Sequence, residues 1–237
     1  VLVVDDVAVN QKLLKLQLER LGFKVEIAGD GREAFEKVKQ SNFDIVLMDC
    51  DMPRVDGYEA TEMIRAIAND SKKSEVPIVA VTAYDREGDK EKCLASGMND
   101  YITKGSAESL LREMLAKWLK IDSQLSESAD DLSHTAKARN ILFEDGAAVD
   151  YKELRRIYGA QEADEIVKLF LGVTGTFIQC LDLAVASKDA ESVSHFAYSI
   201  KGPLSSLKLR QLADLASKLP QQAAKHKWKE AKKSYDE

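Results

Sequence analysis

The feature that most constrains the fold is a short apolar run that ends in a carboxylate. Residues Ile45 to Met48 are continuously apolar and are followed at once by Asp49, a pattern typical of a central strand buried on both faces of a parallel sheet. Pro53 and the pair Asp56-Gly57 lie just beyond and predict a loop before the next helix. Because ligands bind at the carboxyl edge of open α/β sheets, we expect Asp49 to lie in a binding site.

Apolar runs and helical patterns alternate on both sides of this strand. We expect strands at residues 1–4, 24–28, 43–48, 77–82 and 101–102, and helices at 9–21, 30–40, 57–68, 86–96 and 110–118. This alternation favours right-handed crossovers and therefore predicts an α/β domain with a doubly wound, five-stranded parallel sheet.

The pattern changes after Leu119. Residues 122–145 are rich in Ser and Asp and have little apolar periodicity, which predicts a linker. Between residues 146 and 237 apolar residues recur every three or four positions without a strand pattern, so we expect an all-α helical bundle. The predicted domains are therefore 1–121 and 146–237. Because the chain starts inside a strand-like run, we expect it to be a piece of a longer polypeptide, with a bundle that could be truncated.

Composition argues against several classes of function. The chain has 34 Lys plus Arg against 40 Asp plus Glu, a formal net charge of -6, which gives no reason to expect nucleic acid or an anionic membrane as partner. No uninterrupted apolar run approaches the roughly 18 residues of a membrane span, and no signal-peptide pattern is present. We therefore expect a cytoplasmic location and no membrane segment in this chain.

The three cysteines, Cys50, Cys93 and Cys180, are far apart in the sequence and form no C-x-x-C pair. Their odd number and spacing argue against both a disulfide framework and a zinc site, and they fit a reducing compartment. We expect all three to be small buried apolar side chains.

Five side chains fall at the carboxyl ends of four predicted strands: Asp5, Asp6, Asp49, Thr82 and Lys104. Three carboxylates that meet there would raise one another's pKa unless a cation neutralises them, and an all-oxygen cluster that keeps waters suits Mg²⁺. A carboxylate beside this metal, a hydroxyl and an ammonium is the set of groups used in in-line phosphoryl transfer. Asp49 would be the nucleophile and would carry an acyl phosphate, while the other groups would stabilise the phosphoryl oxygens.

Four motifs together resemble the response-regulator receiver domain, a flavodoxin-like fold: V-L-V-V-D-D at residues 1–6, D-I-V-L-M-D-C-D-M-P-x-x-D-G at 44–57, V-T-A at 81–83, and the late Lys104. The resemblance covers about half of the chain. It implies that Asp49 is the phosphoacceptor, that Asp6 binds Mg²⁺ directly and Asp5 largely through water, and that the backbone carbonyl of Asp51 is a further ligand.

The same resemblance implies that Thr82 and Lys104 contact the phosphoryl oxygens and that Tyr101 is the aromatic switch residue. Gly105 departs from the pattern, because the family usually has a proline after this lysine, joined by a cis bond. A cis bond before a residue other than proline costs about 3–4 kcal/mol. We therefore expect a trans bond or a looser loop at Lys104-Gly105.

Residues 192–202 resemble the phosphorylated helix of a histidine phosphotransfer (HPt) domain, which carries A-H-x-x-K-G. Ala197, Lys201 and Gly202 fit this motif, whereas Tyr198 stands at the histidine position. A phenol with a pKa of about 10 forms a phosphate ester too stable to be handed back to an aspartate. His195, one turn earlier, is the alternative phosphoacceptor, although it lacks the lysine and glycine at the spacing that this chemistry uses.

These patterns predict a two-component phosphorelay protein, with a receiver domain and a degenerate HPt-like bundle that docks receiver domains without relaying phosphate. The expected phosphodonor is a histidine kinase or an HPt protein, and no enzymatic turnover is expected beyond self-phosphorylation. Two alternatives stay open: a working relay through His195, and a phosphatase of the haloacid-dehalogenase type that uses Asp49 and Asp51. That phosphatase family places its D-x-D on the first strand, and Asp5 and Asp6 would then have no role.

Overall fold

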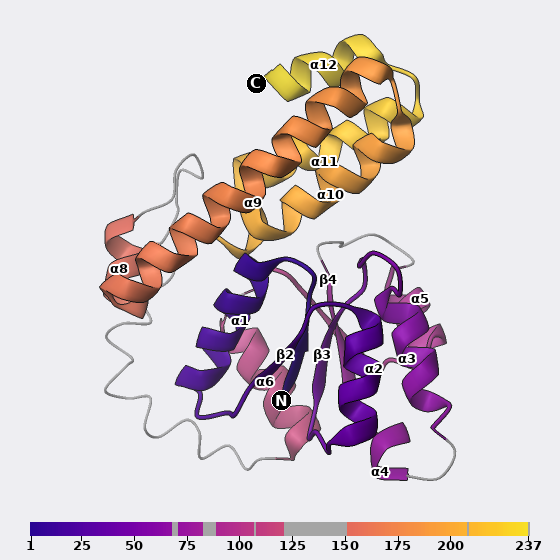
Figure 1. The fold of residues 1–237 in the computed structure, drawn as a ribbon, viewed down its shortest axis with the longest axis vertical. Helices are drawn as coiled ribbons and strands as arrows, with labels where there is room; N and C mark the ends of the chain where they lie inside the picture. Colours follow the sequence, from indigo (N-terminus) through magenta and orange to yellow (C-terminus); the bar gives the residue numbers. More distant parts are fainter. Residues whose placement is uncertain (68–70, 83–88, 107, 121–150, 208, 237) are drawn as a thin grey trace. The chain divides into compact units, whose positions relative to one another are not determined.

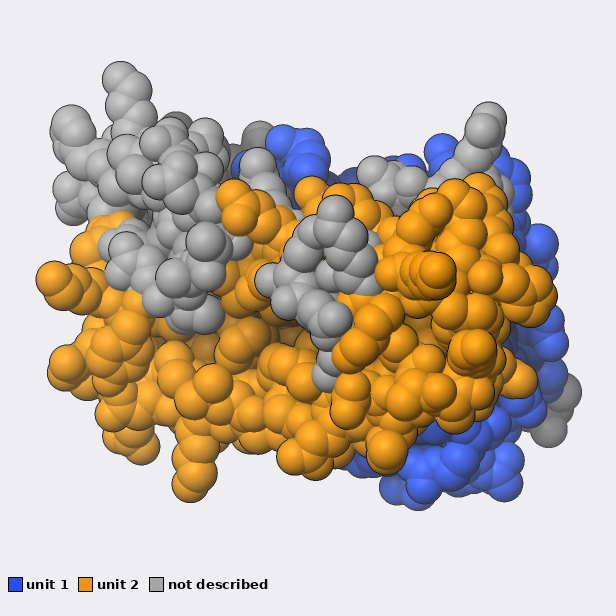
Figure 2. Space-filling model, turned by 90° about the horizontal axis from the view of Figure 1, so that it is seen from above, with its two compact units in different colours: residues 1–134 blue, residues 135–237 orange. Residues whose placement is uncertain are grey.

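The chain is described by a computed structural model, which covers residues 1–67, 71–82, 89–106, 108–120, 151–207 and 209–236. It divides into two compact units, residues 1–134 and 135–237, which Figure 2 shows in different colours. The predicted linker at 122–145 and both predicted domain boundaries, at 121 and 146, lie outside the described residues, so the exact boundaries stay predictions.

The first unit is built on one five-stranded parallel sheet with the strand order β2-β1-β3-β4-β5. The strands are β1 (Leu2–Val4), β2 (Glu26–Ala28), β3 (Val46–Asp49), β4 (Ile78–Thr82) and β5 (Asp100–Thr103). In the central strand, Val46 pairs with Leu2 of β1 on one side and with Ile78 of β4 on the other. The predicted doubly wound parallel sheet is confirmed.

Helices connect these strands and cover both faces of the sheet (Figure 1). They are α1 (Ala8–Arg20), α2 (Gly31–Gln40), α3 (Gly57–Arg65), α4 (Ser71–Ser74), α5 (Asp89–Ala95) and α6 (Glu108–Leu119). The sequence patterns predicted all of these except α4, whose four residues, SKKS, contain no apolar periodicity. Asp30 and Asp56 begin α2 and α3, since their carboxylates accept hydrogen bonds from the backbone N–H groups of Glu33 and Glu59.

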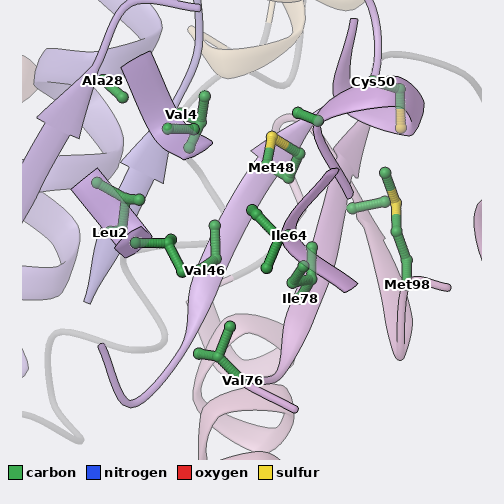
Figure 3. Close-up of a cluster of buried hydrophobic side chains, with 14 of the residues drawn as sticks. Leu2, Val4, Ala28, Val46, Met48, Cys50, Ile64, Val76, Ile78 and Met98 are labelled. Carbon is green, nitrogen blue, oxygen red and sulfur yellow. The ribbon is translucent and has the colours of Figure 1, made fainter. Parts of the chain in front are cut away.

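The core of this unit consists of two layers, one on each face of the sheet, because successive strand side chains point to opposite faces. The layer drawn in Figure 3 joins alternate strand residues to α2, α3 and α5: Leu2, Val4, Val46, Met48, Ile78, Ala80, Ala34, Val38, Ala60, Ile64 and Cys93. The opposite layer joins the intervening strand residues to α1 and α6: Val3, Ile45, Leu47, Val79, Val81, Leu18, Leu111, Met114 and Leu115. Helices on both sides thus hold the strand ends in fixed positions.

The described part of the second unit is all-helical, and the predicted helical bundle is confirmed. Its helices are α8 (Tyr151–Tyr158), α9 (Ala160–Ser187), α10 (Ala190–Ser206), α11 (Arg210–Ala224) and α12 (Trp228–Asp236). Its buried cluster comes from α9, α10, α11 and α12 and contains Leu181, Ala184, Val185, Val193, Ala197, Leu219, Ala223 and Ala231. Asp189 begins α10 by accepting hydrogen bonds from the backbone N–H groups of Glu191 and Ser192.

Helix α9 is, by length and composition, apolar enough to cross a membrane, although the sequence predicted no such segment. The prediction was based on uninterrupted apolar runs. Glycine, threonine and glutamine, which are uncharged, interrupt the apolar residues of α9, so this helix contains no long uninterrupted run. A core helix of a soluble protein passes the same test, so α9 is weak evidence for a membrane segment. Leu171 and Leu183 on this helix are 63% and 71% exposed.

Candidate functional site

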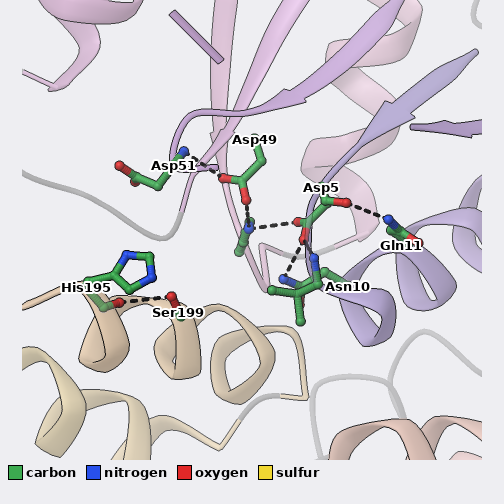
Figure 4. Close-up of polar contacts among 9 residues, drawn as sticks. Asp5, Asn10, Gln11, Asp49, Asp51, His195 and Ser199 are labelled. Carbon is green, nitrogen blue, oxygen red and sulfur yellow. Dashed lines mark hydrogen bonds and ion pairs between the residues drawn. The ribbon is translucent and has the colours of Figure 1, made fainter. Parts of the chain in front are cut away.

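Three carboxylates meet at the carboxyl edge of the sheet in the first unit. Asp5 and Asp6 directly follow β1, and Asp49 is the last residue of β3. Their side-chain oxygens all lie within 4.8 Å of one another; Asp5 and Asp49 are buried, whereas Asp6 is exposed. The predicted convergence of these three residues is confirmed, and Figure 4 shows Asp5 and Asp49 facing each other.

Lys104, which follows β5, brings a positive charge into this cluster. Its Nζ atom lies 2.6 Å from Asp49 Oδ2 and 2.8 Å from Asp5 Oδ2, and only 6% of its side chain is exposed. The backbone N–H of Lys104 donates to the carbonyl oxygen of Thr82 at 2.7 Å, which ties its loop to the end of β4. Lys104 therefore joins the ends of three strands.

In the ion pair of Asp49 and Lys104, burial shifts the pKa of each group in one direction and the charge of its partner shifts it in the other. Burial raises the pKa of the Asp49 carboxyl well above its usual range, Asp5 and Asp6 raise it further, and the ammonium of Lys104 opposes them. Burial alone would lower the pKa of Lys104, but the two carboxylates outweigh it, so this pKa lies above its usual range. The lysine thus stays charged, and added positive charge at the cluster favours ionised Asp49.

Hydrogen bonds from the start of α1 fix the orientation of Asp5. Its Oδ1 atom accepts from the backbone N–H of Val7 at 2.8 Å and from Nδ2 of Asn10 at 3.1 Å. Gln11 Nε2 donates to the backbone carbonyl of Asp5 at 2.5 Å (Figure 4). The sequence patterns did not predict a role for Asn10, a polar side chain on the buried face of α1 that is only 5% exposed.

The loop after β3 is held close to Asp49. The backbone N–H of Asp51 donates to Asp49 Oδ1 at 3.3 Å, and the N–H of Gly57 donates to the carbonyl of Cys50 at 3.1 Å. A Cβ atom on Gly57 would lie 2.0 Å from the backbone oxygen of Asp49. Glycine is therefore required at the end of this loop.

Thr82 is buried at the end of β4, and Tyr101 on β5 is half-buried against the core layer of α2, α3 and α5. The described peptide bonds include no cis bond, so Lys104-Gly105 is trans, as the absence of proline favoured. Gly105 has φ 78°, in the left-handed region that suits glycine. The structure thus places Thr82 at the end of β4 and Tyr101 within β5. The roles of these two residues in a phosphorylation response stay predictions.

The residues of the cluster fit a hard divalent cation. Asp5, Asp6 and Asp49 offer carboxylate oxygens only, and exposed Asp6 leaves one side open to water. Mg²⁺ prefers oxygen ligands and keeps several waters, so it matches this donor set.

In the second unit, α10 carries the HPt-like residues. Tyr198 and Lys201 are half-buried, Gly202 is buried and His195 is exposed. The imidazole of His195 packs edge-on against the ring of Phe196, with centroids 5.1 Å apart. Ser199 Oγ donates to the backbone carbonyl of His195 at 2.9 Å, as Figure 4 shows.

The helix continues through Pro203 to Ser206, so the proline lies within its last turn. The bundle-facing side of α10 is formed by other residues, namely Val193, Ala197, Ile200 and Leu204, which are buried. Helical spacing alone therefore brings His195 and Tyr198 to one side of α10. No charged cluster comparable to the one around Asp49 is seen among the described residues of this segment.

Residues 1–116 match the family model described as "Response regulator receiver domain". The chain is 43% identical over 118 residues to the sensor protein GacS of Pseudomonas syringae pv. syringae, covering 50% of this chain and 13% of that protein. It is 29% identical over 224 residues to the histidine-protein kinase BarA of Shigella flexneri, covering 94% of this chain and 24% of that protein. The chain thus spans a quarter or less of these curated relatives.

Among solved structures, the chain is similar to the receiver domain of the sensor histidine kinase PA1611 from Pseudomonas aeruginosa, described with a magnesium ion coordinated in its active site cleft. The two are 39% identical, and the match covers 51% of this chain and 96% of that one, with a TM-score of 0.47. A second match is a chain of the co-crystal structure of the Saccharomyces cerevisiae histidine phosphotransfer signaling protein Ypd1 and the receiver domain of its downstream response regulator Ssk1. The identity is 31%, the match covers 49% of this chain and 86% of that one, and the TM-score is 0.46.

Proposed function

We propose that this chain, whose residues 1–116 are a response regulator receiver domain, accepts a phosphoryl group on Asp49 in a two-component phosphorelay. The observation that carries the proposal is the burial of Asp49 beside Asp5 and Lys104, within 2.8 Å of one ammonium nitrogen. Burying charged groups is costly unless they are paired, and this pairing leaves one carboxylate directly beside a cation at a ligand-binding sheet edge.

In the proposed reaction, an Asp49 carboxylate oxygen attacks the phosphorus of a phosphohistidine. The new P–O bond forms as the P–N bond breaks, and the leaving imidazole nitrogen takes a proton. Bound Mg²⁺, held by Asp5, Asp6, Asp49 and the backbone carbonyl of Asp51, would neutralise charge on the phosphoryl oxygens. The phosphodonor is a histidine kinase or an HPt protein.

Lys104 has two roles in this proposal. Before the reaction it pairs with the Asp49 carboxylate at 2.6 Å, and afterwards the same ammonium contacts a phosphoryl oxygen. The hydroxyl of Thr82, at the end of the neighbouring strand, contacts another. Its movement toward the phosphoryl group would let the half-buried ring of Tyr101 turn inward, which would transmit the phosphorylated state to the β5 surface.

The geometry favours this function over a phosphatase of the haloacid-dehalogenase type. The second aspartate of the D-x-D pattern, Asp51, is exposed, whereas the buried partners of Asp49 are Asp5 and Lys104. Receiver domains are typically non-enzymatic, so we expect no turnover of a generic phosphate ester. Sustained hydrolysis of such an ester that requires Asp51 would favour the phosphatase instead.

The test is chemical trapping of the phosphorylated residue. The full chain is incubated with acetyl phosphate and Mg²⁺, and the product is then reduced with borohydride, which converts an aspartyl phosphate to homoserine. Peptide mass mapping should find homoserine at position 49. Modification at a different position, or at none, would contradict the assignment of Asp49.

We further propose that the helical unit is a degenerate HPt module, which docks receiver domains without relaying phosphate. Support comes from Tyr198 at the histidine position, with Lys201 and Gly202 one turn later on the same helix α10. The alternative is a working relay through His195, which is exposed.

A transfer assay separates these two possibilities. A separate phosphorylated receiver is mixed with the full chain carrying Asp49→Asn, so that only the helical unit can accept the label. We expect binding without transfer. Transfer that disappears when His195→Ala is added would establish the working relay and contradict the docking-only proposal.

A further inference from the structure

Two thiols lie side by side directly behind the phosphoacceptor. Cys50 follows Asp49 in the sequence, and its Sγ atom lies 3.7 Å from Sγ of Cys93 on α5. Both side chains are buried, with 0% and 1% exposure. Figure 3 shows Cys50 among the packed side chains of this core layer. The sequence separates the two cysteines by 43 residues, so only the fold reveals the pair.

Cys93 is the attachment of α5 to the core. Among residues 90–95 of this helix, Cys93 is buried and the others are exposed. The neighbouring helix α3 lies beside the pair, since Tyr58 packs against the core layer that contains both cysteines and Lys92 Nζ lies 3.9 Å from the centroid of the Tyr58 ring. The position of α5 is therefore coupled, through one sulfur–sulfur contact, to the loop that begins at Asp49.

We propose that Cys50 and Cys93 form a dithiol–disulfide modification site, oxidised by exchange with a small disulfide such as oxidised glutathione. Because both thiols are buried, the exchange requires a transient opening of α5, which Cys93 holds against the core. In the opened form the Cys93 thiolate attacks a glutathione sulfur and forms a mixed disulfide, and Cys50 then displaces the remaining glutathione. Two cysteine S–H groups are oxidised, one S–S bond of glutathione is reduced, and both protons end on the two released glutathione thiols.

Closing this bond changes the surroundings of the phosphoacceptor. A disulfide has its sulfurs about 2.05 Å apart, so the two Sγ atoms must approach each other by about 1.7 Å, through rotation of the side chains together with a shift of α5 or of the loop after β3. Asp49 is the residue next to Cys50 and is paired with Lys104 at 2.6 Å. The part of this shift that the loop after β3 takes up slows phosphoryl acceptance, because a misplacement of about 1 Å can cost on the order of 100-fold in a positioned reaction. This second part of the proposal rests on the proposed function of Asp49.

The first experiment maps the disulfide in the full chain, independently of any phosphorylation. Reduced protein is incubated with oxidised glutathione, quenched in acid, alkylated in denaturant and digested without reductant. We expect a cross-linked peptide that joins Cys50 to Cys93, formed equally in a Cys180→Ser control and absent from Cys93→Ser. Wild-type protein that shows glutathione on Cys180 but no Cys50–Cys93 cross-link would overturn the proposal, whether or not the variants fold.

The second experiment measures labelling of Asp49 by acetyl phosphate in the oxidised and the reduced protein. We expect labelling of the oxidised protein to be roughly tenfold slower or more, to recover with dithiothreitol, and to be insensitive to oxidation in Cys93→Ser. Equal rates in both forms would overturn the coupling between the thiols and Asp49. If the reduced protein is not labelled at all, the proposed function of Asp49 fails, and the peptide map still decides the disulfide.

Discussion

The site around Asp49 and the segment around Tyr198 are assembled differently. Asp5, Asp49 and Lys104 come from the ends of three strands, and the buried carboxylates of both aspartates lie within 2.8 Å of the Lys104 ammonium nitrogen. Tyr198 and Lys201 lie on one helix and would be neighbours in any helix with this sequence. Burying charged side chains from separate strands in one place costs free energy and requires the tertiary fold. It is therefore stronger evidence of function than the spacing of residues along one helix.

The largest expected effect comes from removing the metal, which tests whether the acidic cluster works as one unit. With a chelator that removes Mg²⁺, we expect labelling of Asp49 by acetyl phosphate to fall below detection, because three carboxylates within 4.8 Å then repel the anionic donor. Labelling that is unchanged at saturating chelator would show that Lys104 alone is sufficient and would remove the metal from the account.

The next largest effect is expected from removing the buried positive charge of Lys104. Lys104→Met leaves two buried carboxylates without their shared cation, which should lower the free energy of unfolding by about 3 kcal/mol without Mg²⁺, and less with it. Labelling of Asp49 should fall as well. Denaturant unfolding with and without Mg²⁺ measures the first effect.

The matched control for this change is Lys117→Met. Lys117 also pairs with an aspartate, Asp100, at 2.6 Å, but its side chain is 62% exposed. An exposed pair contributes about 0–1 kcal/mol, so this variant should unfold close to wild type. Equal losses in the two variants would contradict the distinction between the buried and the exposed lysine.

A smaller effect is expected in the helical unit. Tyr198→His in the Asp49→Asn background should restore some phosphoryl transfer from a separate receiver, because Lys201 and Gly202 are already present on α10. Transfer should stay below that of an intact HPt domain, since Pro203 in the last turn removes a backbone hydrogen bond from the same helix. Adding Pro203→Ser should increase it further. A Tyr198→His protein that neither binds nor accepts phosphate would remove the docking role.

The smallest effect concerns the half-buried carboxylate of Asp100 and its dependence on pH. Burial would raise the pKa of Asp100, but hydrogen bonds from Lys117, Trp118 and the N–H of Tyr101 lower it below its usual value. A lowered folded-state pKa stabilises the protein above the unfolded pKa of about 3.9, and this contribution is lost as pH falls through the folded pKa. Asp100→Asn should therefore cost less than about 1 kcal/mol at pH 7, with no difference near pH 2. Thermal unfolding against pH measures this.

The sequence predicted the receiver fold well because its strands are short, apolar and regularly spaced, and four of the five deliver a functional side chain to the same edge. It did not predict Asn10, because a polar residue inside a helical pattern looks like a surface position until the helix is packed against Asp5. The pairing of Cys50 with Cys93 was not predicted either, since no spacing rule relates residues on different elements. Cys180 is half-buried and not fully buried as predicted.

In the second unit the helical class was evident from periodicity, whereas function was not. The apolar residues of α10 report only which side packs in the bundle, and the HPt-like residues follow one another on a single helix. Helix α10 runs through Pro203 to Ser206, so the proline that follows the HPt-like glycine does not end the helix.

The most direct test of the central claim compares two carboxylates at opposite ends of the same sequence run. Asp44 is exposed before β3, and Asp49 is buried at the carboxyl end of that strand. With acetyl phosphate and Mg²⁺, we predict one base-labile phosphoryl group per chain in wild type and in Asp44→Asn, and none in Asp49→Asn. Persistent labelling of Asp49→Asn at the wild-type level, with the fold intact by circular dichroism, would contradict the assignment of Asp49 as phosphoacceptor.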